Sequence, residues 1–136
     1  MGIYSKSKYI EPVSDSRFAY IYLNINFIQV IIMRQIEKNI VGAFIRGENA
    51  RMDNTESKNG TLFLHGNPIA MLGDNDRLYI SNAGWETRTT QSRLNAVLTL
   101  ANKYTRVYTR NYEMRIDSGD NDIVTMNNSD WYLVTE

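Results

Sequence analysis

Residues 61–80 constrain the fold of this chain most strongly, because tight turns divide them into three short apolar runs. The dipeptide Gly66-Asn67 ends the first run, and glycine supplies the positive φ that a two-residue hairpin turn requires. A second turn at 73–76 leads into the third run, which covers residues 77–80. Connections this short join antiparallel strands, so the centre of the chain is predicted to be a three-stranded antiparallel meander.

Helical periodicity flanks the meander on both sides. Apolar residues recur at the helical period in two sets, which are Ile36, Ile40, Ala43 and Phe44 before the meander and Leu94, Val97, Leu98 and Ala101 after it. We expect Gly47 to end the first helix, and Thr89 or Thr90 to cap the start of the second. Each helix therefore has one apolar face with which it can cover a sheet.

The other segments complete the predicted order of elements. Residues 48–60 have no apolar period and are expected to form a surface connection. Strands are expected at 123–126, at 131–135 and at 105–116, the last with one side formed by Tyr108, Tyr112, Met114 and Ile116. The predicted fold class is α+β: an antiparallel sheet of five or six strands with two helices packed on it, in the order helix, meander, helix, strands.

Residues 1–32 are predicted to be an N-terminal extension, and residues 33–136 a single α+β domain. The apolar run 18–33 is shorter than the roughly 20 residues of a membrane-spanning helix and contains polar residues at its centre. We therefore expect no membrane contact, and interpret the run as an added strand, a part of the core or a contact of a homo-oligomer. Acidic residues separate it from the nearest lysines, which argues against an export signal and predicts a cytoplasmic protein.

The chain offers little of the chemistry that enzymes use. It contains no cysteine, which excludes thiol catalysis and cysteine-ligated zinc, and its one histidine, His65, is interpreted as a structural residue of a hairpin. The acidic loop 117–122 does not match the ligand spacing of a calcium site, and no glycine-rich phosphate loop is present. We therefore predict a protein that is not an enzyme and that uses no metal and no cofactor.

Charge is balanced over the whole chain but not along it. The 15 Lys and Arg residues equal the 15 Asp and Glu residues, yet basic residues outnumber acidic ones within segment 86–116. Tyrosines alternate with arginines there, as in sites that stack bases and contact phosphates. The candidate binding residues of this segment are Arg88, Arg93, Arg106, Tyr108, Arg110 and Tyr112.

Two alternatives remain open for the same segment. In the first, 105–116 is an amphipathic strand that keeps its tyrosines on the core side and its arginines in water. The second concerns the start of the second helix, for which two interpretations compete. Arg88 and Arg93 could form an anion site with the unpaired amides of the first turn. Otherwise this is a capped helix held by the packing of Trp85 and by a bond from Arg93 to the loop.

Three motifs carry a resemblance to known proteins. They are Leu64-His65-Gly66-Asn67-Pro68-Ile69-Ala70, Gly84-Trp85-Glu86-Thr87-Arg88-Thr89-Thr90-Gln91-Ser92-Arg93-Leu94-Asn95, and Trp131-Tyr132-Leu133. Together they resemble a set of small proteins encoded by tailed bacteriophages. The resemblance implies a phage product with the same strand–helix–strand order, and it implies no activity and no catalytic residues.

Size, the missing catalytic constellation and the resemblance favour an accessory protein over an enzyme. We predict a non-enzymatic phage protein that binds a host protein in the host cytoplasm, either to redirect host machinery or to block a bacterial immune system. The alternative is a small nucleic-acid-binding module that uses segment 86–116.

Overall fold

The computed structural model describes residues 34–119 and 122–135, and the predictions for residues 1–32 lie outside them. These residues form the predicted α+β fold with antiparallel sheets. The larger sheet has six strands, in the spatial order β1 (Ala50–Met52), β2 (Thr55–Lys58), β3 (Thr61–Leu64), β4 (Asn67–Leu72), β5 (Leu78–Ile80) and β9 (Tyr132–Val134). The smaller sheet has three, which are β6 (Arg106–Arg110), β7 (Glu113–Asp117) and β8 (Ile123–Thr125).

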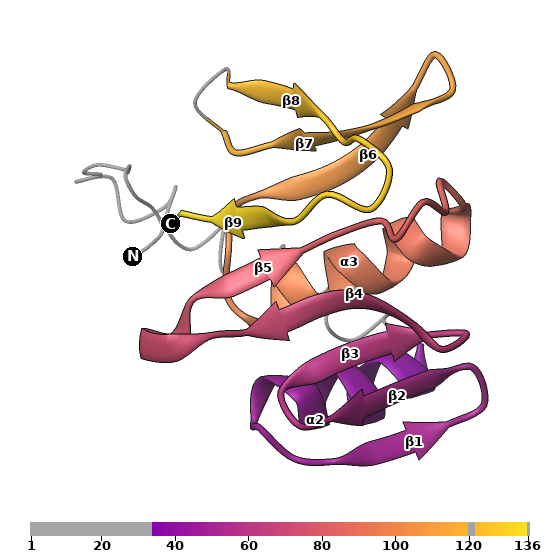
Figure 1. The fold of residues 1–136 in the computed structure, drawn as a ribbon, viewed down its shortest axis with the longest axis vertical. Helices are drawn as coiled ribbons and strands as arrows, with labels where there is room; N and C mark the ends of the chain where they lie inside the picture. The colour runs from indigo at the N-terminus through magenta and orange to yellow at the C-terminus, as the bar shows by residue number, and fades with distance from the viewer. Residues whose placement is uncertain (1–33, 120–121, 136) are drawn as a thin grey trace, which may run out of the picture.

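The helical elements are η1 (Glu37–Val41), α2 (Gly42–Ile45), η2 (Asp74–Asp76) and α3 (Arg88–Leu100). Figure 1 shows α2 and α3 behind the larger sheet and the smaller sheet at the upper end of the molecule. One apolar core joins these parts, because buried side chains of both helices contact those of both sheets. No helix within the described ranges is long and apolar enough to cross a bilayer.

The two predicted helical stripes are confirmed. Within η1 and α2, Ile40, Ala43 and Phe44 are buried, and Gly47 follows with a φ of 77°. Backbone amides of Gly47 and Glu48 bond back to the helix, so the left-handed residue ends it as expected. In α3, Leu94, Val97 and Leu98 are fully buried against the same core.

The expectation of a surface connection at 48–60 is wrong, because this segment forms β1 and β2 and extends the sheet. The inward side chains of β2 are Thr55 and Ser57, which are buried although they are polar. Their hydroxyls are satisfied by hydrogen bonds, from Ser57 to the Glu48 carbonyl and from Arg93 to Thr55. A search for apolar alternation cannot detect a strand whose buried face consists of hydroxyls.

The meander is confirmed, with its first turn displaced by one residue. The two-residue loop is His65-Gly66, with φ values of 51° and 79°, and Asn67 already pairs with Leu64. The strand β9 then pairs with β5, so the C-terminal segment completes the larger sheet. The pairing of these distant strands closes the core over α3.

Two local predictions in the second half of the chain need correction. The cap of α3 is Thr87, not Thr89 or Thr90, and its hydroxyl accepts a bond from the Thr90 amide at 3.1 Å. The single strand expected at 105–116 is a hairpin, since Asn111 and Tyr112 form a turn with φ values of 53° and 64°. This turn lacks the glycine that usually marks such a loop, which is why the sequence pattern did not reveal it.

An asparagine of α3 attaches the smaller sheet to the helix. The Asn95 side chain donates to the Val107 carbonyl and accepts from the Val107 amide, both at 2.8 Å. The amide group thus takes the place that a neighbouring strand would occupy along β6. This side chain complements the apolar packing of Val107, Met114 and Ile116.

A buried ion pair lies between the helices. Arg93 Nη1 is 2.8 Å from Glu37 Oε2, and the two side chains are only 3% and 5% exposed. The same guanidinium donates to Thr55 Oγ1 and Asn54 Oδ1, and Ser92 donates to Glu37. One cation therefore joins α3 to η1 and to the start of β2.

Replacing one partner of this pair should destabilise the fold. We expect Glu37→Gln to lower the free energy of unfolding by about 3–5 kcal/mol, because it leaves the Arg93 charge buried without its counter-charge. The matched control is Glu48→Gln, which removes the carboxylate of an exposed pair with Arg46 and should cost about 1 kcal/mol or less. Urea unfolding monitored by circular dichroism measures both values, and equal losses would contradict a structural role for the buried pair.

The apolar core also predicts that residues 33–136 fold without the preceding segment. The core cluster already joins both helices and both sheets within residues 40–134. We expect a fragment starting at Met33 to be soluble, to melt cooperatively and to keep the subunit number of the full chain. Thermal unfolding and light scattering of both forms test this, and an insoluble fragment or a changed oligomer would assign the N-terminal run to the core or to a subunit interface.

Candidate functional site

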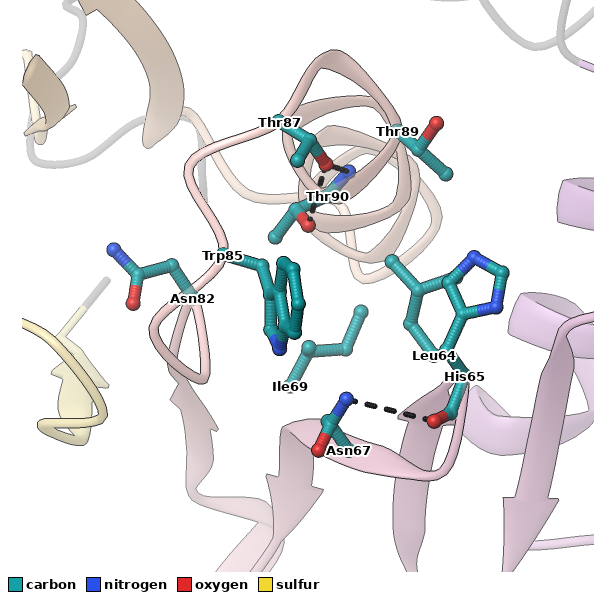
Figure 2. Close-up of a pocket in the computed structure, with 9 residues that line it drawn as sticks. All are labelled: Leu64, His65, Asn67, Ile69, Asn82, Trp85, Thr87, Thr89 and Thr90. Carbon is teal, nitrogen blue, oxygen red and sulfur yellow. Dashed lines mark hydrogen bonds between the residues drawn. The ribbon is translucent and has the colours of Figure 1, made fainter. Parts of the chain in front are cut away.

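A pocket lies where the β3–β4 turn faces the start of α3. It encloses about 290 Å³ and is lined by Leu64, His65, Asn67, Ile69, Asn82, Trp85, Thr87, Thr89 and Thr90. Figure 2 shows the Trp85 indole on one side and His65 on the other, with Leu64 and Ile69 between them and the threonines of α3 above. Two of the three sequence motifs, far apart along the chain, thus meet at one place.

The loop that carries Trp85 is held by its own hydrogen bonds. The Ser81 and Asn82 side chains, both buried, accept bonds from the amides of Ala83 and Gly84 at 3.0 and 2.8 Å. The Trp85 amide bonds to the Asn82 carbonyl at 2.8 Å, and Gly84 has a φ of 84° that a residue without a side chain adopts at low cost. These bonds fix the loop backbone while Trp85 itself stays 57% exposed.

The opposite wall is held by the buried polar network. The His65 amide donates to the Asn54 carbonyl at 2.7 Å, and the Asn54 side chain accepts from Thr55 and from Arg93. Arg93 is anchored by Glu37, so the position of the His65 turn depends on the ion pair between the helices. Hydrogen bonds therefore hold the backbone on both sides of the pocket.

The lining of the pocket is mostly apolar, with hydroxyl and amide groups at its edges. Leu64, Ile69 and Trp85 give an apolar floor and wall, and His65 is the one titratable side chain among the residues that line the pocket. A histidine relay needs a carboxylate and a nucleophile within hydrogen-bond reach, and no carboxylate lines this pocket. In the described ranges no three His, Asp or Glu side chains are grouped as a metal site requires.

The candidate residues predicted from the sequence are divided by the structure. Arg88, Arg106, Tyr108 and Tyr112 line one open groove of about 1030 Å³ between α3 and β6, which we call the α3–β6 groove. Arg93 is buried in the ion pair, and Arg110 is exposed at the end of β6 outside the lining of the groove. The start of α3 is capped, as the capped-helix interpretation predicts. The rest of that interpretation is wrong, because Arg93 bonds Glu37, Thr55 and Asn54 instead of the loop before the helix, and Trp85 is exposed.

Residues of α3 and β6 fix the shape of the α3–β6 groove. Thr109 donates to the Gln91 side chain at 2.8 Å across it, and Asn95 holds β6 through Val107. Arg106 Nη1 donates to the carbonyls of Lys103 and Thr105, which sets the direction of its guanidinium. The groove is thus a preformed polar channel with cations and tyrosines on its walls.

The comparison with protein families shows the origin of the chain. A family model described as Kyanoviridae Gp96 protein matches residues 33–135, which is well over half of the chain and includes every residue that lines the pocket or the groove. The pocket and the groove thus belong to a protein of a bacteriophage family. The chain belongs to the Kyanoviridae Gp96 protein family. No curated protein and no solved structure matches it.

The sequence does not reveal the roles of two lining residues of the pocket and of one residue that supports it. Trp85 is expected to pack and is exposed, Thr87 is the cap in place of Thr89 or Thr90, and Asn54 lies in a segment expected to be a surface connection. Trp85 and Thr87 belong to one sequence motif and His65 to another, and the two motifs meet at the pocket. The motifs themselves are therefore the sequence signal that points to this site. Asn54 lies outside these two motifs, and its role depends on a bond to Arg93 from a distant helix.

The cap of α3 also forms part of the pocket wall, which leads to a prediction. Thr87→Ala should lower the free energy of unfolding by about 0.5–2 kcal/mol, since the Thr90 amide loses its acceptor. Thr89→Ala is the control, because Thr89 lines the same pocket without capping the helix, and it should change stability by less than about 0.5 kcal/mol. Chemical denaturation of both variants measures the difference, and a larger loss from Thr89→Ala would contradict the assigned cap.

Proposed function

We propose that this phage protein is a non-enzymatic accessory factor that binds a host protein, with the Trp85 pocket as the docking site for an apolar side chain of that partner. The observation that carries the proposal is an exposed tryptophan at the wall of a preformed apolar pocket. Tryptophan is among the residues that most often dominate binding energy at protein interfaces. The exposed 57% of its surface adds no burial to the isolated fold, so a partner that covers it would gain that burial.

The rigidity of the pocket supports protein binding. Hydrogen bonds hold the backbone on both sides of Trp85 and His65 before any partner arrives, which lowers the entropy lost on association. The volume of about 290 Å³ lies at the lower end of the range for pockets that hold a whole small molecule. A single aromatic or branched side chain, presented by a protein surface, matches this size.

The proposed consequence is interference with a host process. Binding of this kind would either redirect host machinery or block a bacterial immune protein, and it would take place in the host cytoplasm during infection. Membership in a phage protein family supports this setting. The lining supports a binding role because it combines apolar contacts with hydroxyl and amide groups and lacks a carboxylate.

Capture from host lysate with paired tryptophan variants tests the proposal. We expect a stoichiometric host protein to be retained by the native chain and by Trp131→Ala, and to be lost, or bound about 30-fold more weakly, with Trp85→Ala. Trp131 is the matched control, because it is 38% exposed and does not line the pocket. Thermal melting of the three proteins verifies that each one is folded.

Two outcomes would count against this function. A protein captured equally by all three forms would show that the pocket is not its docking site. The absence of any stoichiometric partner across several lysate conditions would remove host-protein binding itself. Purified partner and titration calorimetry then give the affinity difference between Trp85→Ala and Trp131→Ala directly.

A further inference from the structure

The α3–β6 groove is separate from the Trp85 pocket and has a different chemistry. Its walls carry three arginines and two tyrosines, and its floor is the polar face of α3. The residues on that floor are Gln91, Ser92, Asn95 and Thr99. From Arg88 to Thr99 the helix axis rises about 16 Å, the length of roughly five stacked nucleotides at 3.4 Å each.

The charge inside the groove is positive although the whole chain is neutral. Arg34 and Arg88 both line the groove and are exposed, so two solvated guanidinium groups border it. Of the two carboxylates that line it, Glu37 is neutralised by Arg93 and only Glu86 is exposed. A local excess of cations in a concave surface attracts a polyanion even when the net charge is zero.

Tyr112 has an unfavourable backbone conformation that packing in the fold does not explain. It is 96% exposed at the tip of the β6–β7 hairpin, and its φ of 64° is a left-handed conformation that glycine or asparagine adopts more readily. A fully exposed aromatic ring in an unfavourable backbone conformation contributes no packing. Its face is instead available beside the groove that Tyr108 also lines.

We infer that the α3–β6 groove is a binding site for single-stranded nucleic acid, with arginines at the phosphates and Tyr108 and Tyr112 stacking on bases. Single-strand sites combine a positive channel with aromatic platforms, because every base has a face on which a ring can stack. An acidic peptide would use the arginines but would give the tyrosines no such role. The groove lies on one side of the helix and the Trp85 pocket at its start, so this inference does not depend on the proposed function.

Fluorescence anisotropy with the full-length protein tests the inference. The probes are labelled single strands of about 12 nucleotides, in DNA and RNA forms, together with the corresponding DNA duplex. We expect single strands to bind at low salt, duplex to bind more weakly, and the affinity to fall steeply as salt rises. The DNA and RNA arms show which of the two the groove prefers.

Two variants and two controls connect this binding to the groove. Arg88→Gln should weaken binding about 5-fold or more and reduce the slope of log K against log salt by about 0.7. Tyr112→Gly should weaken binding about 5-fold or more without lowering the melting temperature, because an Asn-Gly turn suits the left-handed backbone. Arg77→Gln, at an exposed residue outside the groove, and Trp85→Ala should leave binding unchanged.

Several results would overturn the inference. These are no anisotropy change at micromolar protein in low salt, duplex binding as tight as single-strand binding, or equal losses for Arg88→Gln and Arg77→Gln. Displacement of the labelled strand by poly-glutamate at matched charge concentration, with no effect of Tyr112→Gly, would assign the groove to an acidic peptide instead. If Tyr112→Gly binds as tightly as the native chain while Arg88→Gln does not, Tyr112 does not stack on a base.

Discussion

The bond between Arg93 and Glu37 organises the structure, because it places one buried guanidinium among three separate parts of the chain. Removing two charges from water is costly, and the pair is retained only because each group also finds hydrogen-bond partners. Those partners are Thr55 and Asn54 for the arginine and Ser92 for the glutamate. An apolar pair of similar volume would fill the same space without specifying how α3, η1 and β2 meet.

Both candidate sites depend on this polar centre. Asn54 carries the network to the His65 turn and thus to one wall of the Trp85 pocket. On the other side, Glu37 and Ser92 line the α3–β6 groove, where Glu37 accepts hydrogen bonds from both Ser92 and Arg93. The neutralisation of Glu37 is also what leaves the groove with an excess of positive charge. One interaction therefore sets the shape of the pocket and the electrostatics of the groove.

The parts of the fold that the sequence predicted are those specified by apolar periodicity. The stripes around Phe44 and Leu94 and the meander of 61–80 all bury apolar side chains at regular spacing. Apolar periodicity does not predict β2, because its buried side chains are those of Thr55 and Ser57. Their hydroxyls bond to partners from elsewhere in the chain. The usual turn signal does not predict the Asn111-Tyr112 turn either, because tyrosine stands where a glycine is expected. Of the six candidate binding residues, Arg88, Arg106, Tyr108 and Tyr112 line the groove and Arg110 does not. The burial of Arg93 follows from a contact with a distant helix that no local pattern reveals.

The amide of Asn95 has a further consequence for the protein in a crowded cell. An unpaired strand edge is a template on which another chain can add a strand, and such pairing leads to aggregation. Asn95 occupies the amide and carbonyl of Val107, the second residue of β6. A foreign strand would have to displace a side chain that is already held at good geometry. The helix thus protects the β6 edge of the smaller sheet from intermolecular pairing.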